Sequence, residues 1–193
     1  RIDYSNDTAT AAAKGPLSDA REGLAATGNA SFGYFGDGSS PGAVSTVDRI
    51  DYSNDTATAV AKGPLSVARQ YMAATGNQSF GYFAGGGSAA GDRSTVDRID
   101  YSNDTATAAA KGPLSAVAQR MGATGNADFG YIGGSDPSKS TVDRIDYSND
   151  TATAAVKGPL SLARSFLAAT GNASFGYFGG GDPGPVSTVD RID

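Results

Sequence analysis

The side chains available for acid–base and nucleophilic chemistry are few. The 193-residue chain contains no His and no Cys, and Glu22 is its single Glu. General acid–base work would therefore fall to Asp, and two Asp carboxylates can in principle hydrolyse a glycoside. No such pair stands out, and no Lys-Ser or Lys-Thr follows the Gly-rich segments as in a phosphate-binding loop. The sequence predicts a protein that is not an enzyme.

Alternating Arg and Asp residues form the most regular charged pattern. Arg and Asp stand two apart in every copy of VDRID, so on a β-strand they lie on one face. We expect ladders of ion pairs between neighbouring units, and the alternative is a ring that binds carboxylates. The residues to which we assign this structural role are Arg49, Asp51, Arg98, Asp100, Arg144 and Asp146.

The SNDT segments contain oxygen-bearing side chains at close spacing. Asn54 and Asp55 are of the type that binds calcium, but Asn, Asp and Thr also satisfy their own backbone in tight turns. We favour the turn and expect no metal and no cofactor. Seven asparagines fit the glycosylation pattern, and turn chemistry accounts for them equally well: Asn6, Asn29, Asn54, Asn77, Asn103, Asn149 and Asn172.

Composition limits the partners. The net charge is −5 and the basic residues are scattered, so we expect no nucleic-acid partner. No apolar run approaches the roughly 20 residues that span a bilayer, so we expect no membrane insertion. Gly contributes 27 residues and Trp none, which favours many small, closely stacked units over a core of large side chains.

Four tandem repeats organise the chain. The triplet RID begins at residues 1, 49, 98, 144 and 191, which gives repeats 1–48, 49–97, 98–143 and 144–190 and a partial fifth repeat, 191–193. We expect one repeat domain covering 1–193. Within each repeat the distance from the Arg of RID to the Asn of TGN is constant, and the length varies only in the loop before STVD.

These variable loops are our candidate ligand-binding positions. Loops at one end of a repeat array share a surface, so their differences would create specificity. The alternative is that they are linkers without a binding role. The residues concerned are Asp37, Ser39, Asp92, Arg93, Asp136, Lys139 and Asp182.

Each repeat contains four extended segments. STVDRIDY alternates in the manner of a strand, SNDT forms a hairpin turn, and TATAVAKG is a thinner strand that ends at Pro64. QYMAATGN and SFGYFAGG supply two more strands around a Gly-Asn turn. The alternative for LSVARQYMAA is an amphipathic helix over 65–74. Four strands in about 47 residues is typical of a propeller blade, so we predict an all-β fold of four-stranded antiparallel blades.

The repeats resemble those of the kelch family. The residues that carry the resemblance are an aromatic pair with a Gly doublet, a V-x-R-x-D strand, a turn that ends in Thr, and a P-L-S-x-A-R segment, at 82–86, 96–100, 104–105 and 64–69. The resemblance implies a β-propeller. Ala57 stands where kelch repeats have Trp, Ala118 replaces the Arg found at Arg21, Arg69 and Arg164, and Asp37 interrupts the first Gly doublet. The repeats also resemble, more weakly, arrays in tail or surface proteins of marine bacteriophages.

Together these features predict a non-catalytic, extracellular or virion-surface module with a structural or adhesive role, which contacts a surface glycan or protein through the variable loops. A second hypothesis is an assembly element that oligomerises or belongs to a longer repeat array, without a ligand. A third is an idealised or designed repeat propeller. Because STVDRID recurs at 187–193, a closed four-bladed ring would contain two candidates for one strand position.

Overall fold

The structure, a computed structural model, describes residues 1–193 and is all-β. Four antiparallel sheets follow one another along the chain, each with its strands hydrogen-bonded in sequence order. The first comprises β1 (Ala25–Gly28), β2 (Phe32–Gly36), β3 (Val47–Asp51) and β4 (Val60–Ala61), and the second β5 (Ala73–Gly76), β6 (Phe80–Ala84), β9 (Val96–Asp100) and β10 (Ala109–Ala110). The third comprises β11 (Gly122–Gly125), β12 (Phe129–Gly133), β13 (Val142–Asp146) and β14 (Ala155–Lys157), and the fourth has three strands, β15 (Ala168–Gly171), β16 (Gly176–Gly179) and β17 (Val189–Ile192).

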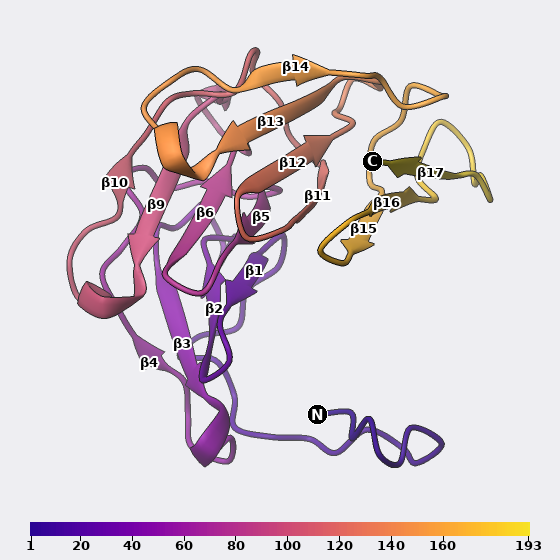
Figure 1. The fold of residues 1–193 in the computed structure, drawn as a ribbon. Coiled ribbons are helices and arrows are strands. Elements are labelled where there is room, and N and C mark those ends of the chain that lie inside the picture. The colour runs from indigo at the N-terminus through magenta and orange to yellow at the C-terminus, as the bar shows by residue number, and fades with distance from the viewer.

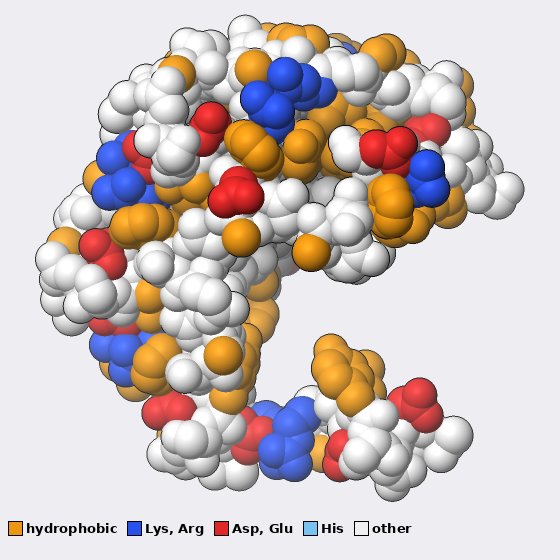
Figure 2. Space-filling view, in the orientation of Figure 1, with side chains coloured by type: hydrophobic (Ala, Val, Ile, Leu, Met, Phe, Trp, Pro, Cys, Tyr) orange, Lys and Arg blue, Asp and Glu red, His pale blue; other side chains and the backbone are white.

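The sheets are arranged as the blades of a propeller (Figure 1). The first strand of each sheet lies innermost, and these strands pack in succession, β1 against β5, β5 against β11 and β11 against β15. The predicted all-β propeller with antiparallel blades is therefore confirmed. In the space-filling view the arc is open between the N-terminal segment and the fourth blade (Figure 2).

Sequence repeats and structural blades are out of phase. RIDYSNDTATA provides the third strand, the hairpin and the fourth strand of one blade, as predicted, and the rest of the same repeat provides the first two strands of the next blade. The second, third and fourth repeats therefore each tie two blades together covalently, whereas the first RIDYSNDTATA, at 1–11, forms no strand. The short β7 (Gly87–Ser88) and β8 (Gly91–Asp92) form a separate hairpin within the second variable loop.

The apolar core lies between blades. One cluster joins the first and second blades, with Tyr34, Val47, Leu65 and Phe83 among its members. A second joins the second and third blades, and a third joins the third and fourth. Because a thin sheet of Ala and Gly buries little surface by itself, the stability of each blade depends on its neighbours.

A single turn of 3-10 helix begins each hairpin, at η1 (Tyr52–Asn54), η2 (Tyr101–Asn103) and η3 (Tyr147–Asn149). The side chain of Asp51 accepts hydrogen bonds from the backbone N–H and the hydroxyl of Ser53, at 2.8 and 2.6 Å. The turn was predicted, but its capping residue is the last Asp of VDRID and not the Asn of SNDT.

The alternative of a helix over 65–74 is wrong. Tyr71 has φ of 60°, and the equivalent Arg120 and Phe166 have φ of 59° and 54°, values outside the right-handed helical region. These residues form a ladder across blades, in which Tyr71 N–H donates to Gly23 and Arg120 N–H donates to Tyr71, both at 2.8 Å. No helix in the structure is long and apolar enough to span a bilayer.

Glycine is required where one blade's hairpin crosses the preceding blade. A Cβ built on Gly63 would lie 1.9 Å from the carbonyl oxygen of Ala106, and one on Gly112 1.9 Å from that of Ala152. At the equivalent Gly158 a Cβ would meet nothing within 4 Å, because no hairpin crosses there. The contact is with backbone, so a substitution at Gly63 or Gly112 must move two blades apart.

We therefore expect Gly112→Ala to lower the free energy of unfolding by about 1–3 kcal/mol or more, the range typical of overpacking. Gly42→Ala, where a Cβ also meets nothing within 4 Å, is the control and should leave stability within about 0.5 kcal/mol of the wild type. Urea unfolding of the three proteins measures both values, and equal effects of the two substitutions would contradict this packing.

Candidate functional site

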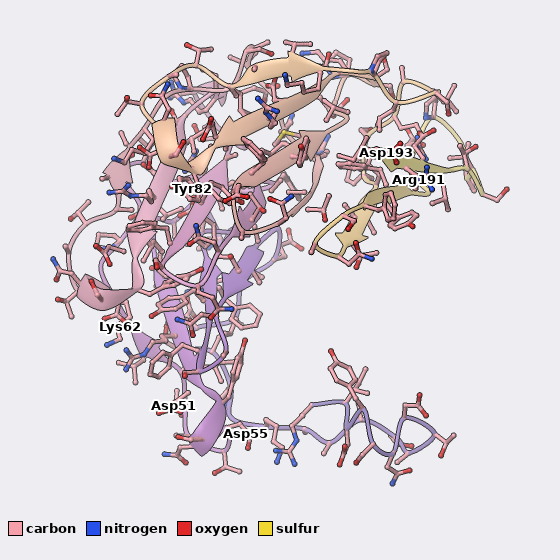
Figure 3. The ribbon with its side chains drawn as sticks, viewed as in Figure 1. Asp51, Asp55, Lys62, Tyr82, Arg191 and Asp193 are labelled. Atoms are coloured by element: carbon pink, nitrogen blue, oxygen red, sulfur yellow. The ribbon has the colours of Figure 1, made fainter.

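The contact between successive blades centres on one aspartate. Asp104, in the hairpin of the second blade, accepts hydrogen bonds from Tyr34 and Arg49 of the first blade at 2.9 and 2.6 Å, and Lys62 lies 3.2 Å away. The same arrangement recurs one blade later, where Tyr82, Arg98 and Lys111 surround Asp150. We call such a Tyr–Arg–Lys set the anchor triad. Lys62 and Tyr82 are labelled in Figure 3.

Burial and charge shape the ionisation of this contact. Burial by itself would raise the pKa of Asp104, but the hydrogen bonds from Tyr34 and Lys62 and the charges of Arg49 and Lys62 lower it overall. Burial, followed by the hydrogen bond to Asp104, raises the pKa of Tyr34 well above its usual range. The aspartate is therefore a carboxylate and the tyrosine a hydrogen-bond donor across the physiological pH range.

Aromatic side chains complete the contact. Tyr34 stacks on Tyr101 of the next blade with ring centroids 4.7 Å apart, and Tyr82 stacks on Tyr147 at the same separation. The guanidinium of Arg49 lies over the ring of Phe32, 4.3 Å from its centroid, which fixes its direction toward Asp104. Each hairpin thus supplies a Tyr and an Asp to a preformed receptor on the preceding blade.

The anchor triad of the third blade receives no hairpin. It consists of Tyr131, Arg144 and Lys157, and none of the three has a carboxylate partner. These side chains line an open groove of about 380 Å³ together with Gly158 and Ile192. The third blade therefore carries every group that elsewhere binds a YSND hairpin, with the position of the hairpin itself unfilled.

Apolar groups of the fourth blade are uncovered at the same end of the arc. Val47, Val96 and Val142 are fully buried at equivalent positions, whereas Val189 is 63% exposed. The ring of Phe166, last in the ladder that begins at Gly23, is 58% exposed. The third strand of the fourth blade, β17, pairs with β16 alone, while every other third strand also pairs with a fourth strand. This surface is the candidate functional site, and we call it the open face.

A segment with complementary groups is present at the other end of the arc. Asp3 accepts hydrogen bonds from Ser5 as Asp51 does from Ser53, so the N-terminal YSND has the same local turn. Tyr4 is 93% exposed, and Asp7 forms no ion pair. In Figure 3, Asp55 lies beside this segment, and Arg191 and Asp193 lie on the distant C-terminal sheet.

The residues predicted to form ladders occupy two different places. Arg49 and Arg98 lie between blades and bind Asp104 and Asp150, while Arg144 is part of the unfilled triad. Asp51, Asp100 and Asp146 do not bind these arginines as partners; each caps its own hairpin through the following Ser. Hydrogen bonds from Ser53 lower the pKa of Asp51, and those from Ser102 and Ser148 do the same for Asp100 and Asp146.

The candidate loop residues lie mainly along contacts between blades. Asp37 is fully buried, the guanidinium of Arg120 binds Asp136, and Lys139 Nζ donates to the Val117 carbonyl at 3.1 Å. Ser39, Asp92 and Arg93 are half-buried, and Asp182, which bridges to Ser165, is exposed. The structure does not gather these seven residues into one pocket.

The deepest charged groups were not among the predicted site residues. Asp48 and Asp97, the aspartates of STVD, are fully buried, and Arg21 and Arg69 bind them at 3.0 and 2.7 Å. Arg164 binds Asp190 in the fourth blade. Two features of the sequence could have identified these ion pairs. The first, second and fourth repeats share an Arg that is Ala118 in the third repeat, and all four repeats contain the aspartate of STVD.

The turn asparagines are engaged by their own backbone. Asn77 accepts hydrogen bonds from the N–H groups of Ser79 and Phe80 and donates to the Ala127 carbonyl at 3.3 Å. The carboxylate of Asp104 is likewise occupied, by the anchor triad. No group of three or more His, Cys, Asp or Glu residues has the geometry to hold a metal ion.

Comparison of the sequence with models of known protein families gives no match, and a search of curated proteins gives none either.

The buried Asp37 makes stability depend on pH. Burial raises its pKa to about 8, even though Arg69, which also binds Asp97, lies 3.5 Å away. In the unfolded chain the pKa of Asp is about 4. The folded protein therefore binds this proton more tightly, and its stability falls as the pH rises from about 4 to about 8.

Asp37→Asn removes this ionisation. When the pH is raised from about 5 to about 8, the free energy of unfolding of the wild type should fall by on the order of a few kcal/mol more than that of Asp37→Asn. Urea unfolding at both pH values measures the difference, with Asp19→Asn, an exposed aspartate, as the control. A difference that does not change with pH would contradict a raised pKa.

Proposed function

We propose that the chain is a non-catalytic structural module that assembles with further copies of its own repeat through the open face. For the 193-residue chain, the hairpin that fills the vacant position comes from the RIDYSNDTATA segment of a second copy; in a longer array of these repeats, the next repeat supplies it. Residues 4–15 of the second copy dock in the groove of the first. Arg1–Asp3 of the second copy have the same sequence as Arg191–Asp193 of the first copy, which take their place.

The observation that carries this proposal is the unfilled anchor triad. In the first and second blades the same three residue types each hold a hairpin aspartate, with Arg-to-Asp distances of 2.6 and 2.7 Å. The equivalent partner for Tyr131, Arg144 and Lys157 is Asp7, and the equivalent stacking partner for Tyr131 is Tyr4. A triad of two cations and a phenol that faces a groove is complementary to a carboxylate next to an aromatic ring.

The edge of β17 supports the same register. Arg49 pairs with Val60 in the first blade, and by repeat position the partner of Arg191 is Ala12 of the second copy. Addition of this strand completes the fourth blade and removes an exposed sheet edge, which natural proteins seldom leave open. It also brings the second copy's following residues, 16–24, toward Val189 and Phe166.

Gly158 provides a selective test. A Cβ built on the other glycines at this position would meet an alanine carbonyl oxygen of the bound hairpin, at 1.8 Å for Gly15 and 1.9 Å for Gly63. Gly158→Ala leaves the isolated chain undisturbed and blocks the docked hairpin at Ala9. We expect light scattering over a dilution series to show a dimer or a growing series for the wild type and a 19.3 kDa species for Gly158→Ala.

Gly42→Ala is the matched control, because a Cβ there also meets nothing within 4 Å and the residue lies in a loop. A synthetic peptide of residues 4–15 should prevent wild-type association, and the same peptide with Asp7→Asn should be weaker by about tenfold or more, since truncating one partner of such a charge pair costs about 2–5 kcal/mol. The proposal fails if the wild type is a 19.3 kDa species at every concentration or if Gly158→Ala associates equally well.

A second candidate function is adhesion at a cell or virion surface. The tips of the variable loops are exposed, at 41–42, 89–91 and 183–185, and they are the segments in which otherwise near-identical repeats differ. We propose a surface glycan or protein as the partner, in keeping with the kelch-like pattern and the likeness to phage surface arrays. An extracellular or virion location belongs to this second proposal.

Replacing the three exposed tips with Gly and Ser tests adhesion without touching the contacts between blades. If the loops bind a receptor, the variant should keep wild-type stability and lose at least tenfold in affinity for host-cell surfaces. The measurement is retention of labelled protein on cells, with Gly158→Ala included to separate adhesion from assembly. Equal retention of the variant and the wild type would exclude the loops as the binding surface.

A further inference from the structure

Every blade carries an aspartate at the second position of VDRID, and this aspartate is buried in the first three blades and half-buried in the fourth. Asp48, Asp97 and Asp190 each bind an arginine that enters from the segment before the first strand of the same blade. In the third blade the arginine is replaced by Ala118, and no Lys or Arg nitrogen lies within 4.0 Å of Asp143. The molecule thus contains three filled sites and one site that has lost its cation.

The filled sites show what the missing cation contacts. Arg69 Nη1 donates to the carbonyls of Gly85 and Thr95 at 2.8 and 2.9 Å, and its Nη2 donates to Asp97 at 2.7 Å. In the fourth blade, Arg164 makes the equivalent three contacts, with the carbonyls of Gly180 and Thr188 again at 2.8 and 2.9 Å. In the second and fourth blades, two carbonyl oxygens and one carboxylate therefore converge on one positive charge, whereas in the first blade Arg21 binds the Asp48 carboxylate alone.

The third blade keeps the oxygens. The backbone hydrogen bond from Gly134 N–H to the Thr141 carbonyl measures 3.1 Å, the same as between Gly180 and Thr188, so the two residues that supply the carbonyls are paired as in the fourth blade. The side chain of Asp143 is only 5% exposed. Its Oδ2 accepts the Ser115 N–H at 3.0 Å, and its buried Oδ1 has no donor.

A cavity occupies the space of the missing side chain. It has a volume of about 20 Å³ and is lined by Ala118, which stands in place of the arginine, and by Gly134, Thr141 and Asp143, the equivalents of the three residues that bind Arg69. That volume holds one particle of about the size of a water molecule. Lys139 also lines the cavity, but its ammonium is bound to the Val117 carbonyl.

We propose that this cavity binds a small monovalent cation, held by the Asp143 carboxylate and the carbonyls of Gly134 and Thr141. A buried carboxylate without a counter-charge is costly, and a bound cation restores the charge balance that arginine provides in the other blades. Carbonyl oxygens can replace the hydration shell of such an ion.

The test compares thermal unfolding of the full chain in chlorides of potassium, ammonium and tetramethylammonium at equal concentration and pH. A cation that binds the folded state alone stabilises it in a concentration-dependent way. We expect Tm to be about 2–4 °C higher in potassium or ammonium than in tetramethylammonium, which is too large for the cavity, and the difference to saturate.

Two variants make the result specific. Ala118→Arg supplies the missing guanidinium, so its Tm should be the same in all three salts. Asp143→Asn removes the carboxylate, and its Tm should also be independent of the cation, which provides a second readout if Ala118→Arg folds poorly. The proposal is overturned if the wild type melts at one temperature in every salt, since Lys139 or a water molecule then satisfies Asp143, or if both variants keep the wild-type difference.

Discussion

A blade of this protein cannot bury its own faces, and the rest of the structure depends on that constraint. The strands are short and rich in Ala and Gly, and the apolar clusters lie between sheets. Consequently the specific interactions also lie between sheets: a hairpin aspartate bound by three residues of the preceding blade, and a tyrosine stacked on a tyrosine. The phase shift between repeat and blade follows from the same constraint, because a unit that began and ended with a blade would leave its neighbours joined only by loops.

Polar groups are buried in this interface at a cost that the geometry offsets. Arg69 is fully buried and satisfies two backbone carbonyls as well as Asp97, so its charge is neutralised and most of its donors are used. Asp37 is the exception, because burial and then the nearby charge of Asp97 raise its pKa, and Arg69, which lowers it, does not offset them. A thin interface of small residues gains directional contacts from such groups, and these fix the register between blades more sharply than Ala and Gly packing does.

Much of the architecture could be predicted from the sequence, and the limits have physical causes. The period, the four strands and the hairpin in RIDYSNDTATA followed from alternation and turn residues, which are local properties. The pairing of Arg49 with Asp104 could not be predicted, because it joins residues 55 apart whose proximity depends on how blades stack. The alternative of a helix over 65–74 is wrong for a related reason: the φ of 60° at Tyr71 accompanies the ladder across blades and has no sign in local composition.

Because the repeats are nearly identical, a position at which one repeat differs can be compared directly with the same position in the other repeats. Gly63 and Gly158 have the same neighbours in sequence, yet only Gly63 has a carbonyl against it, so the difference measures the presence of the next hairpin and nothing else. Val142 and Val189 differ in exposure for the same reason. Ala118 is a departure of the other kind, in which the surroundings are kept and the side chain has changed. The first kind identifies a position that a hairpin occupies in the earlier blades, and the second identifies a carboxylate whose usual arginine is absent, so one repeat sequence produces two different kinds of local departure.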